Sequence, residues 1–336
     1  MTNRLLSSAA GFEPRGLPLA VSRSALALAE LTTIVFTPDH DLFTYEPDLP
    51  NGMRCYGAHG PSLWCVTGPS PTGLLISRVV AIAVLVVAAS GYRPRWTCIP
   101  QWFVTWSLAT SMTLPNGGDE AALVTTMLFV PVLLGDTRTW HWVRPQEPLA
   151  PVWAGSAYAA WCAIRCQIAI IYLSAALSKL RTPHWRDGTA LYSVLVDPNY
   201  GLPLTVRPSL SLVTASDAVI RTLTWAVLGV ELAIALCALS RRSARHAAGW
   251  LAFALHGGIV AAMGLFSFGL TMMALVLSLQ IDERTPPPAA LVTDHPEPAP
   301  HKTPADCCSP QESEPSSAWP RITPSTCGPT TDMESR

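Results

Sequence analysis

The chain has 336 residues, of which 49% are apolar and only 13% are charged. Soluble domains carry about 25% charged residues, so this composition excludes an ordinary water-soluble globule and predicts an all-α, polytopic transmembrane helical bundle surrounded by membrane lipids. The net charge of −1 provides no basic field that would favour nucleic acid as a partner.

Composition divides the chain into three parts. Residues 1–17 are predicted to be a cytoplasmic N-terminal segment and residues 18–280 the transmembrane domain. Residues 281–336 hold 13 of the 45 charged residues and 12 of the 31 prolines, so this segment cannot bury a core and is expected to be a disordered cytoplasmic tail. The first apolar run shows no clear signal-peptide cleavage pattern, which favours a retained spanning helix.

Eight apolar stretches follow one another along the chain. A full membrane span needs about 20 residues, and the third, fourth and eighth stretches are shorter, so they are half-spans or buried hairpins unless neighbours complete them. The expected number of membrane segments is therefore seven or eight. The stretches are 18–36, 74–91, 100–113, 119–135, 152–179, 220–239, 246–263 and 265–280.

The distribution of Lys and Arg predicts the orientation of these segments. With the N-terminus in the cytoplasm, the inner segments hold ten of these residues and the outer segments hold five. Cytoplasmic loops carry the Lys/Arg excess in membrane proteins. The sequence therefore predicts a multi-pass cell-membrane protein with both termini in the cytoplasm.

The first outer loop contains two cysteines, Cys55 and Cys65, which enclose a short segment. A disulfide persists outside the cell, so we expect these residues to be bonded; the alternative is a pair of buried free thiols. The remaining cysteines lie in or beside the spans or in the tail, and no CxxC or HExxH spacing predicts a metal site.

Polar residues inside apolar stretches are costly in a membrane and therefore locate candidate sites. Arg165, Tyr172 and Lys179 are spaced seven residues apart, which places them on one helix stripe. We expect this stripe to line an inward-facing cavity that opens to the outer face, with Trp185 and Asp187 closing over Lys179. The alternative is a buried network that only fixes helix packing, with Lys179 as a snorkelling interfacial lysine.

Other intramembrane polar residues are possible partners of this stripe. Arg23 and Glu30 repeat the seven-residue spacing on the first span and could supply a facing charge. Glu231 is the only acidic residue in the 220–239 stretch and could pair with His256 or Arg165. His256 itself is either a hydrogen-bonding packing residue or a ligand. The candidate catalytic residues are thus Lys179, Arg165, Tyr172, Trp185, Asp187, His256 and Glu231.

Residues 167–195 carry a recognisable pattern: Tyr-Leu, small residues, Lys-Leu, a short gap, Trp, then Asp-Gly-Thr-Ala. This pattern resembles the signature of the horizontally transferred transmembrane (HTTM) domain family, which includes the vitamin-K-dependent gamma-carboxylases. Asn116-Gly117-Gly118-Asp119, the His141-Trp142 loop, the outer cysteine pair and the late His256 are more similar to the bacterial SdpB-type sporulation-delaying branch.

The resemblance implies two different activities. In the carboxylases the matching lysine is the base that deprotonates reduced vitamin K, so Lys179 would be a base and a quinone the cofactor. The SdpB-type branch implies maturation of a secreted peptide toxin together with a small partner protein. The chain lacks a folded extramembrane domain for a propeptide, and His141, the loose match to the second carboxylase histidine, is expected on the face opposite Lys179.

Three functions remain open from the sequence. The first is a membrane protein, catalytic or an essential component of an enzyme, that matures an exported bacterial peptide. The second is a carboxylase-like, quinone-dependent enzyme with Lys179 as its base. The third is a transporter or immunity protein without catalysis, because intramembrane charges suit a transport path equally well. No catalytic triad or zinc motif favours a known protease type.

Overall fold

The structure is a computed structural model that describes residues 9, 11–43, 55, 57–113, 116–197, 201–202 and 216–281. Within these ranges the secondary structure is helical, apart from one isolated bridge between Tyr92 and Trp140, and contains no strand. The all-α prediction is therefore confirmed. The predicted tail, apart from Ile281, lies outside the described residues.

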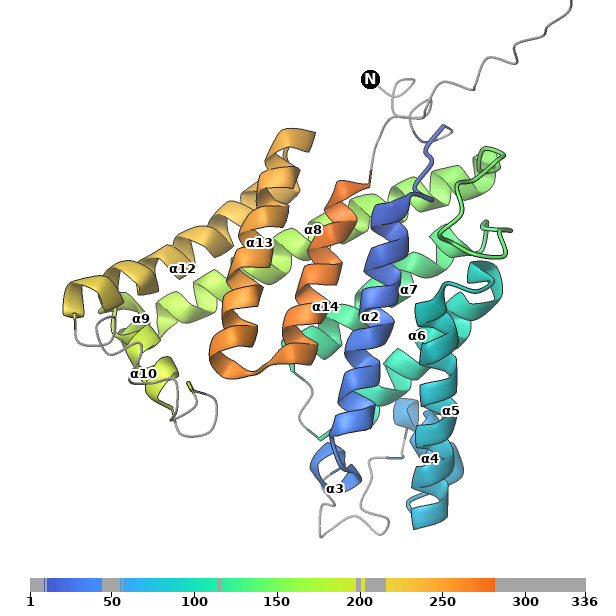
Figure 1. The fold of residues 1–336 in the computed structure, drawn as a ribbon, viewed down its shortest axis with the longest axis horizontal. Coiled ribbons are helices and arrows are strands. Elements are labelled where there is room, and N and C mark those ends of the chain that lie inside the picture. The colour runs from blue at the N-terminus through green and yellow to red at the C-terminus, as the bar shows by residue number, and fades with distance from the viewer. Residues whose placement is uncertain are drawn as a thin grey trace, which may run out of the picture. The chain divides into compact units, whose positions relative to one another are not determined.

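The described part of the chain builds its bundle from long helices that alternate in direction (Figure 1). They are α2 (Leu17–Phe36), α5 (Pro71–Ser90), α6 (Pro94–Ser111), α7 (Gly117–Leu133), α8 (Pro151–Arg181), α12 (Asp217–Ala238), α13 (Arg242–Met263) and α14 (Phe266–Leu277). The short helices are α3 (Asp39–Leu42), η1 (Gly57–His59), α4 (Leu63–Thr67), α9 (Pro183–Arg186), α10 (Ala190–Val196) and η3 (Ser278–Gln280).

The long helices form a closed ring of neighbours. Each helix packs against the next one in the chain, and α14 closes the ring by packing against α2 (Figure 1). A further contact between α14 and α7 crosses the ring and divides it into two halves that share these two helices. We call α2, α5 and α6 the first half, and α8, α12 and α13 the second half.

Local sequence explains where several helices begin. Proline occupies the first turn of α2, α5, α6 and α8, a position where its missing N–H costs nothing. α7 begins with a capping box, in which the Asn116 side chain accepts from backbone N–H groups and Asp119 accepts from the Asn116 N–H at 2.9 Å. α5 ends at Gly91, whose φ of 83° requires glycine.

Five of the described helices are long and apolar enough to span a membrane: α2, α5, α8, α12 and α13. α14 and η3 together form a shorter apolar helix over Phe266–Gln280. The third and fourth apolar stretches are not hairpins, because α6 and α7 are continuous helices. α6 begins six residues before its apolar stretch, since its first turn contains Arg95 and Thr97, which a hydropathy criterion does not count.

Large apolar side chains are exposed along the outside of the bundle. They gather on α5, α12 and α13, on surfaces that would be unfavourable in water. Such surfaces match the lipid-facing sides of spanning helices. The exposed residues on these helices include Leu75, Ile76, Val79, Val80, Val86, Val87, Leu223, Trp225, Leu236, Trp250 and Phe253.

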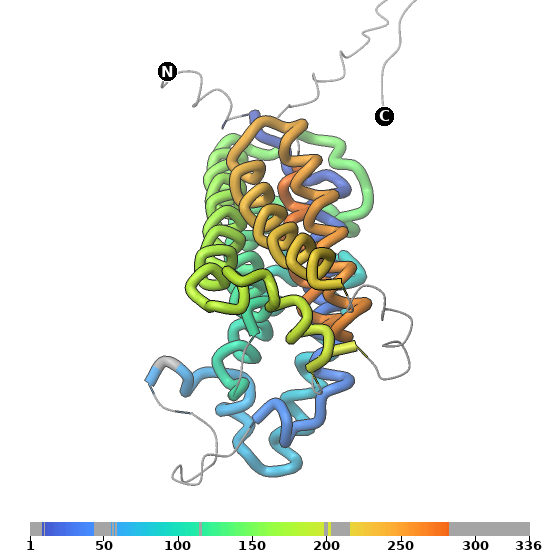
Figure 2. Tube along the Cα trace, turned by 90° about the vertical axis from the view of Figure 1, so that its left-hand side faces the viewer, coloured from blue at the N-terminus to red at the C-terminus, as the bar shows by residue number. Residues whose placement is uncertain are grey.

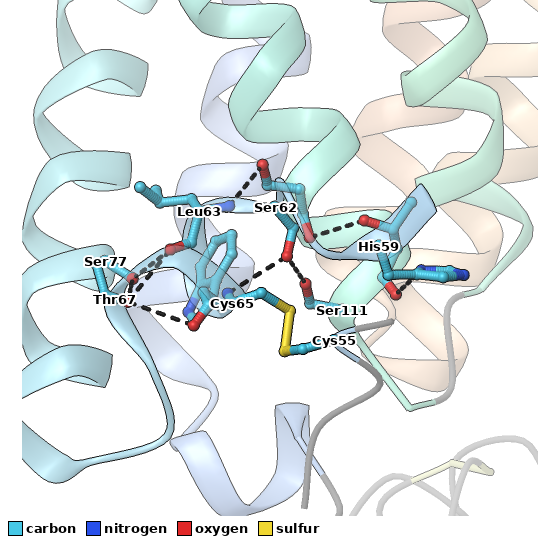
Figure 3. Close-up of a disulfide and its surroundings, with 11 residues drawn as sticks. Cys55, His59, Ser62, Leu63, Cys65, Thr67, Ser77 and Ser111 are labelled. Carbon is cyan, nitrogen blue, oxygen red and sulfur yellow. Dashed lines mark hydrogen bonds between the residues drawn. A yellow bond between two sulfur atoms is a disulfide. The ribbon is translucent and has the colours of Figure 1, made fainter. Parts of the chain in front are cut away.

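A disulfide stabilises one end of the first half. Cys55 and Cys65 are bonded, with Cα atoms 5.4 Å apart, so the predicted pairing is confirmed (Figure 3). Beside it, the hydroxyl of Ser62 accepts from the Cys65 backbone N–H and bonds to Ser111 on α6 (Figure 3). The segment that contains α4 lies at the opposite end of the bundle from the 134–150 loop (Figure 2).

Candidate functional site

The last third of α8 carries the candidate site, because two of its predicted polar residues meet side chains from α12 and α13. Tyr172 is fully buried, whereas Lys179, two helical turns later, keeps 26% of its side chain exposed. Residues seven apart in a helix lie on the same side, and α8 packs this side against α12. The stripe therefore faces protein, as the spacing predicted.

Lys179 forms an ion pair with Glu231 of α12. Its Nζ donates to the Glu231 Oε1 at 2.6 Å, and the Glu231 side chain is only 8% exposed. The sequence had suggested His256 or Arg165 as the partner of Glu231, and the structure replaces both with Lys179. This pair combines a reachable ammonium group with a nearly buried carboxylate.

The short α9 helix brings an aromatic ring over Lys179. α8 ends at Arg181, and Pro183 begins α9 immediately, so the chain turns back toward the end of α8. The Lys179 Nζ lies 5.4 Å from the centroid of the Trp185 ring, within the range of a cation–π interaction. The expected closure of Trp185 over Lys179 is therefore present.

Tyr172 and His256 form a second polar contact deeper in the bundle. The Tyr172 hydroxyl lies 2.7 Å from Nε2 of His256 on α13, and both side chains are buried. The His256 ring also packs edge-on against Phe268 of α14, with ring centroids 5.5 Å apart. These contacts hold the imidazole in place and direct its other nitrogen away from Tyr172.

Two buried polar atoms in this region have no hydrogen-bond partner among the described residues. They are Oε2 of Glu231 and Nδ1 of His256. Buried polar atoms nearly always have a protein or water partner, so each marks a place where a water molecule or a polar group of a ligand would be stabilised. Arg23 Nη1 and Glu30 Oε1 on α2 also have no partner among the described residues, so it is the partial exposure of Lys179 that distinguishes this region.

Arg165 is not part of this site. Its guanidinium donates to the carbonyls of Ala238 and Ser240, at 2.9 and 3.1 Å, and lies 4.7 Å from the Trp161 ring centroid. Fourteen residues separate Arg165 from Lys179, which corresponds to about 21 Å along the helix. The expectation of one cavity lined by Arg165, Tyr172 and Lys179 is therefore wrong for Arg165, which binds the C-terminal carbonyls of α12.

Two further expectations also change. Asp187 is exposed, and its backbone N–H donates to the Pro183 carbonyl at 2.8 Å; among the described residues its side chain forms no hydrogen bond or ion pair with Lys179. The two charged residues of α2 face α6 instead of α8: Arg23 donates to Gln101 and Thr97, and Glu30 accepts from Thr105. Arg23 and Glu30 therefore supply no charge to the candidate site.

His141 lies far from Lys179, as expected. Its loop precedes α8, whereas Lys179 is near the opposite end of that helix. The His141 ring contacts the Ser24 hydroxyl at 3.3 Å and packs where a Cβ on Gly91 would collide with it. Burial, followed by the nearby charges of Arg23 and Arg138, lowers the pKa of His141 to about 3. A neutral, enclosed imidazole at this position stabilises the loop.

The sequence did not reveal the Lys179–Glu231 pair because it depends on how α8 and α12 align. These helices are antiparallel, and Arg165 meets the end of α12 near Ala238. Moving along α8 toward Lys179 therefore means moving back along α12, which leads to Glu231. The antiparallel order of the two polar stripes is the signal in the sequence that indicates this contact. Among the described residues, no group of three His, Cys, Asp or Glu could hold a metal ion.

A ring of apolar helices that encloses a few paired polar residues defines a polytopic helical membrane protein. Two proteins of Bacillus subtilis are similar to the chain over most of its length. The uncharacterized protein YitO is 30% identical over 264 residues, covering 76% of this chain and 82% of its own. The sporulation-delaying protein SdpB is 29% identical over 259 residues, covering 77% of this chain and 79% of its own.

The chain belongs to the family that YitO and SdpB represent. No protein-family model matches it, and no solved structure matches it either. The SdpB-type resemblance is therefore supported, whereas the comparisons show no relation to HTTM domains or gamma-carboxylases.

Proposed function

We propose that this protein has an SdpB-like role in the maturation of an exported bacterial peptide and that Lys179 and Glu231 form its reactive pair. The family relation to SdpB supports the role. One structural observation carries the assignment of the site: Lys179 keeps 26% of its side chain exposed while it pairs with the nearly buried Glu231, whose second carboxylate oxygen has no partner among the described residues. A secreted peptide and a small partner protein are the partners this role would require.

The geometry suits proton transfer at the edge of the bundle. The Lys179 ammonium donates directly to Glu231, so a proton can move between them without rearrangement. The free oxygen of Glu231 can accept a hydrogen bond from a bound peptide group or from water. Trp185 covers the ammonium group and limits its access to solvent. Tyr172 and His256 are assigned a positioning role beneath this pair.

The proposed topology places this site at the outer face. In support, the arginine-rich segments near Arg15, Arg93, Arg138 and Arg245 all lie at the end of the bundle opposite α9 and α10. With the basic end in the cytoplasm, both termini are cytoplasmic and Lys179 faces the side where an exported peptide would be processed.

A carboxylase-like, quinone-dependent activity is the second candidate, and the Lys179 geometry is the observation that favours it. Such an enzyme needs an unprotonated lysine, and Glu231 is placed to take the proton. The side chain of Lys179 also remains partly exposed beneath an aromatic ring. A purified protein that binds a quinone and loses turnover with Lys179→Ala would favour this candidate.

The proposed function is tested by complementation of a strain that lacks its own copy of the gene. Mass spectrometry of the exported peptides should show a processed species with the wild-type protein and its loss with Glu231→Gln. Asp39→Asn is the matched control, because Asp39 pairs with Arg78 at 2.5 Å outside the proposed site. Normal processing by a Glu231→Gln protein that accumulates to the wild-type level would contradict the proposal.

A further inference from the structure

A cleft at the arginine-rich end of the bundle lies far from Lys179. It has a volume of about 730 Å³ and is formed by the 134–150 loop, the start of α8 and residues Arg15 and Arg95. Four arginines line it, Arg15, Arg95, Arg138 and Arg144, together with a single acidic residue, Glu147. Its lining is therefore positively charged.

Two of these arginines build the wall of the cleft. Arg15 pairs with Glu13 at 2.6 Å and donates to the Glu147 carbonyl at 2.6 Å. Arg138 pairs with the fully buried Asp136 at 2.6 Å. Burial lowers the pKa of Arg15, but its hydrogen bond to Glu13 and the neighbouring acids outweigh this effect and raise it, so Arg15 stays charged.

Arg138 also ties the loop to the rest of the bundle. It donates to the backbone carbonyls of Arg15, at 3.2 Å, and His141, at 3.0 Å, and to that of Val143. These bonds fix the loop against the segment that precedes α2. Hydrogen bonds within the protein therefore hold this wall of the cleft in place.

The other two arginines, Arg95 and Arg144, remain available for a ligand. Both are exposed, and neither forms an ion pair with an acidic residue among the described residues. Arg95 contacts the Trp96 ring, with its Cζ 5.9 Å from the centroid. Guanidinium groups form paired hydrogen bonds to phosphate oxygens, so these two side chains at one cleft favour a phosphate group.

Aromatic residues around the cleft indicate its place in the membrane. Trp140 lines the cleft and is 43% exposed, while Trp96 and Trp142 are exposed nearby. Tryptophan is enriched at the membrane–water interface, where lipid headgroups lie. Basic pockets at this level bind anionic headgroups.

We propose that this cleft binds the phosphate of an anionic phospholipid headgroup through Arg95 and Arg144. Lipid bound here contacts the 134–150 loop, the start of α8 and α6 at the same time. Its binding therefore stabilises the end of α8 that is opposite the candidate site.

The test measures the melting temperature of the detergent-purified, full-length protein against three probes: short-chain phosphatidylglycerol, short-chain phosphatidylcholine and inorganic phosphate. Phosphatidylglycerol should raise the melting temperature and the other two should not. The double variant Arg95→Gln/Arg144→Gln should bind phosphatidylglycerol at least about tenfold more weakly. The exposed pair Arg241→Gln/Arg242→Gln, which lies outside the cleft, is the matched control and should bind as the wild type does.

Three results would overturn the proposal. Equal stabilisation by inorganic phosphate would replace the lipid with a soluble anion. Equal weakening by both double variants would show general attraction to a basic surface instead of a site. The absence of any shift with phosphatidylglycerol in the wild-type protein, or an undiminished shift in the Arg95→Gln/Arg144→Gln variant, would show that these two arginines bind no such headgroup.

Discussion

The two halves of the ring each contain a polar pair spaced seven residues apart, and the two pairs have different surroundings. Arg23 and Glu30 of α2 are enclosed between α2 and α6, and Arg23 is 0% exposed. Tyr172 and Lys179 of α8 run from the interior to a partly exposed end. Both regions contain buried polar atoms without a partner among the described residues. Exposure at Lys179, and not spacing or incomplete hydrogen bonding, therefore separates a reactive pair from a packing network.

Breaking the enclosed pair should have the largest effect on stability. Arg23→Ala removes the donor to Gln101 and Thr97, at 3.0 and 2.7 Å, and leaves a cavity beside these two side chains. Because two buried polar groups lose their partner and a cavity forms, the free energy of unfolding should fall by about 3 kcal/mol. Unfolding in mixed micelles with increasing denaturing detergent measures this change. The exposed Arg241→Ala is the control, and equal stability of the two variants would mean that the α2 pair does not hold the first half together.

The disulfide should contribute the next largest effect, also in the first half. It joins residues ten apart in sequence, and closing a loop of this size in the unfolded chain is worth about 2–3 kcal/mol. The variant Cys55→Ala/Cys65→Ala should lose this amount in the same unfolding measurement under oxidising conditions. Reducing agent should lower the stability of the wild type but leave the variant unchanged. A wild type that is insensitive to reductant would contradict this prediction.

His141 should make the first half sensitive to acid. Its pKa is lowered to about 3 in the folded protein, against about 6.5 when unfolded, so the unfolded chain binds the proton more readily between these values. Stability should therefore be fully present above pH 6.5 and fall by at most about 1.4 kcal/mol for each pH unit between 6.5 and about 3. His141→Gln should flatten this slope, and an unchanged slope would assign the acid sensitivity to other groups.

The smallest effect on stability is expected from the reactive pair. Replacing both charges with neutral amides, in Lys179→Gln/Glu231→Gln, avoids leaving one charge buried alone and should change stability by less than about 1 kcal/mol. Lys179→Gln alone should cost more, since it leaves the carboxylate of Glu231 without its partner. A double variant as unstable as Arg23→Ala would mean that the polar residues of α2 and α8 contribute equally to stability. The Lys179–Glu231 pair would then have a structural role.

Much of the fold could be predicted from the sequence. Apolar stretches located the long helices, and the spacing of Cys55 and Cys65 in one loop was enough to pair them. The direction in which each polar stripe faces could not be predicted, because periodicity defines a side of a helix but not its neighbour. The α2 stripe consequently faces α6, while Arg165 binds the end of α12. The proximity of Lys179 and Trp185 could be predicted, because Pro183, two residues after the end of α8, forces the chain to turn.

The most direct test of the account is whether Lys179 acts as an exchangeable proton carrier or only as a charge. Lys179→Arg retains the charge and the ion pair with Glu231, but a guanidinium does not release its proton. We predict that this variant accumulates normally in the membrane and fails to yield the processed exported peptide. The matched control Arg78→Lys, which preserves the charge beside Asp39, should process it normally. Full processing by Lys179→Arg would contradict the account and leave Lys179 with a purely electrostatic role.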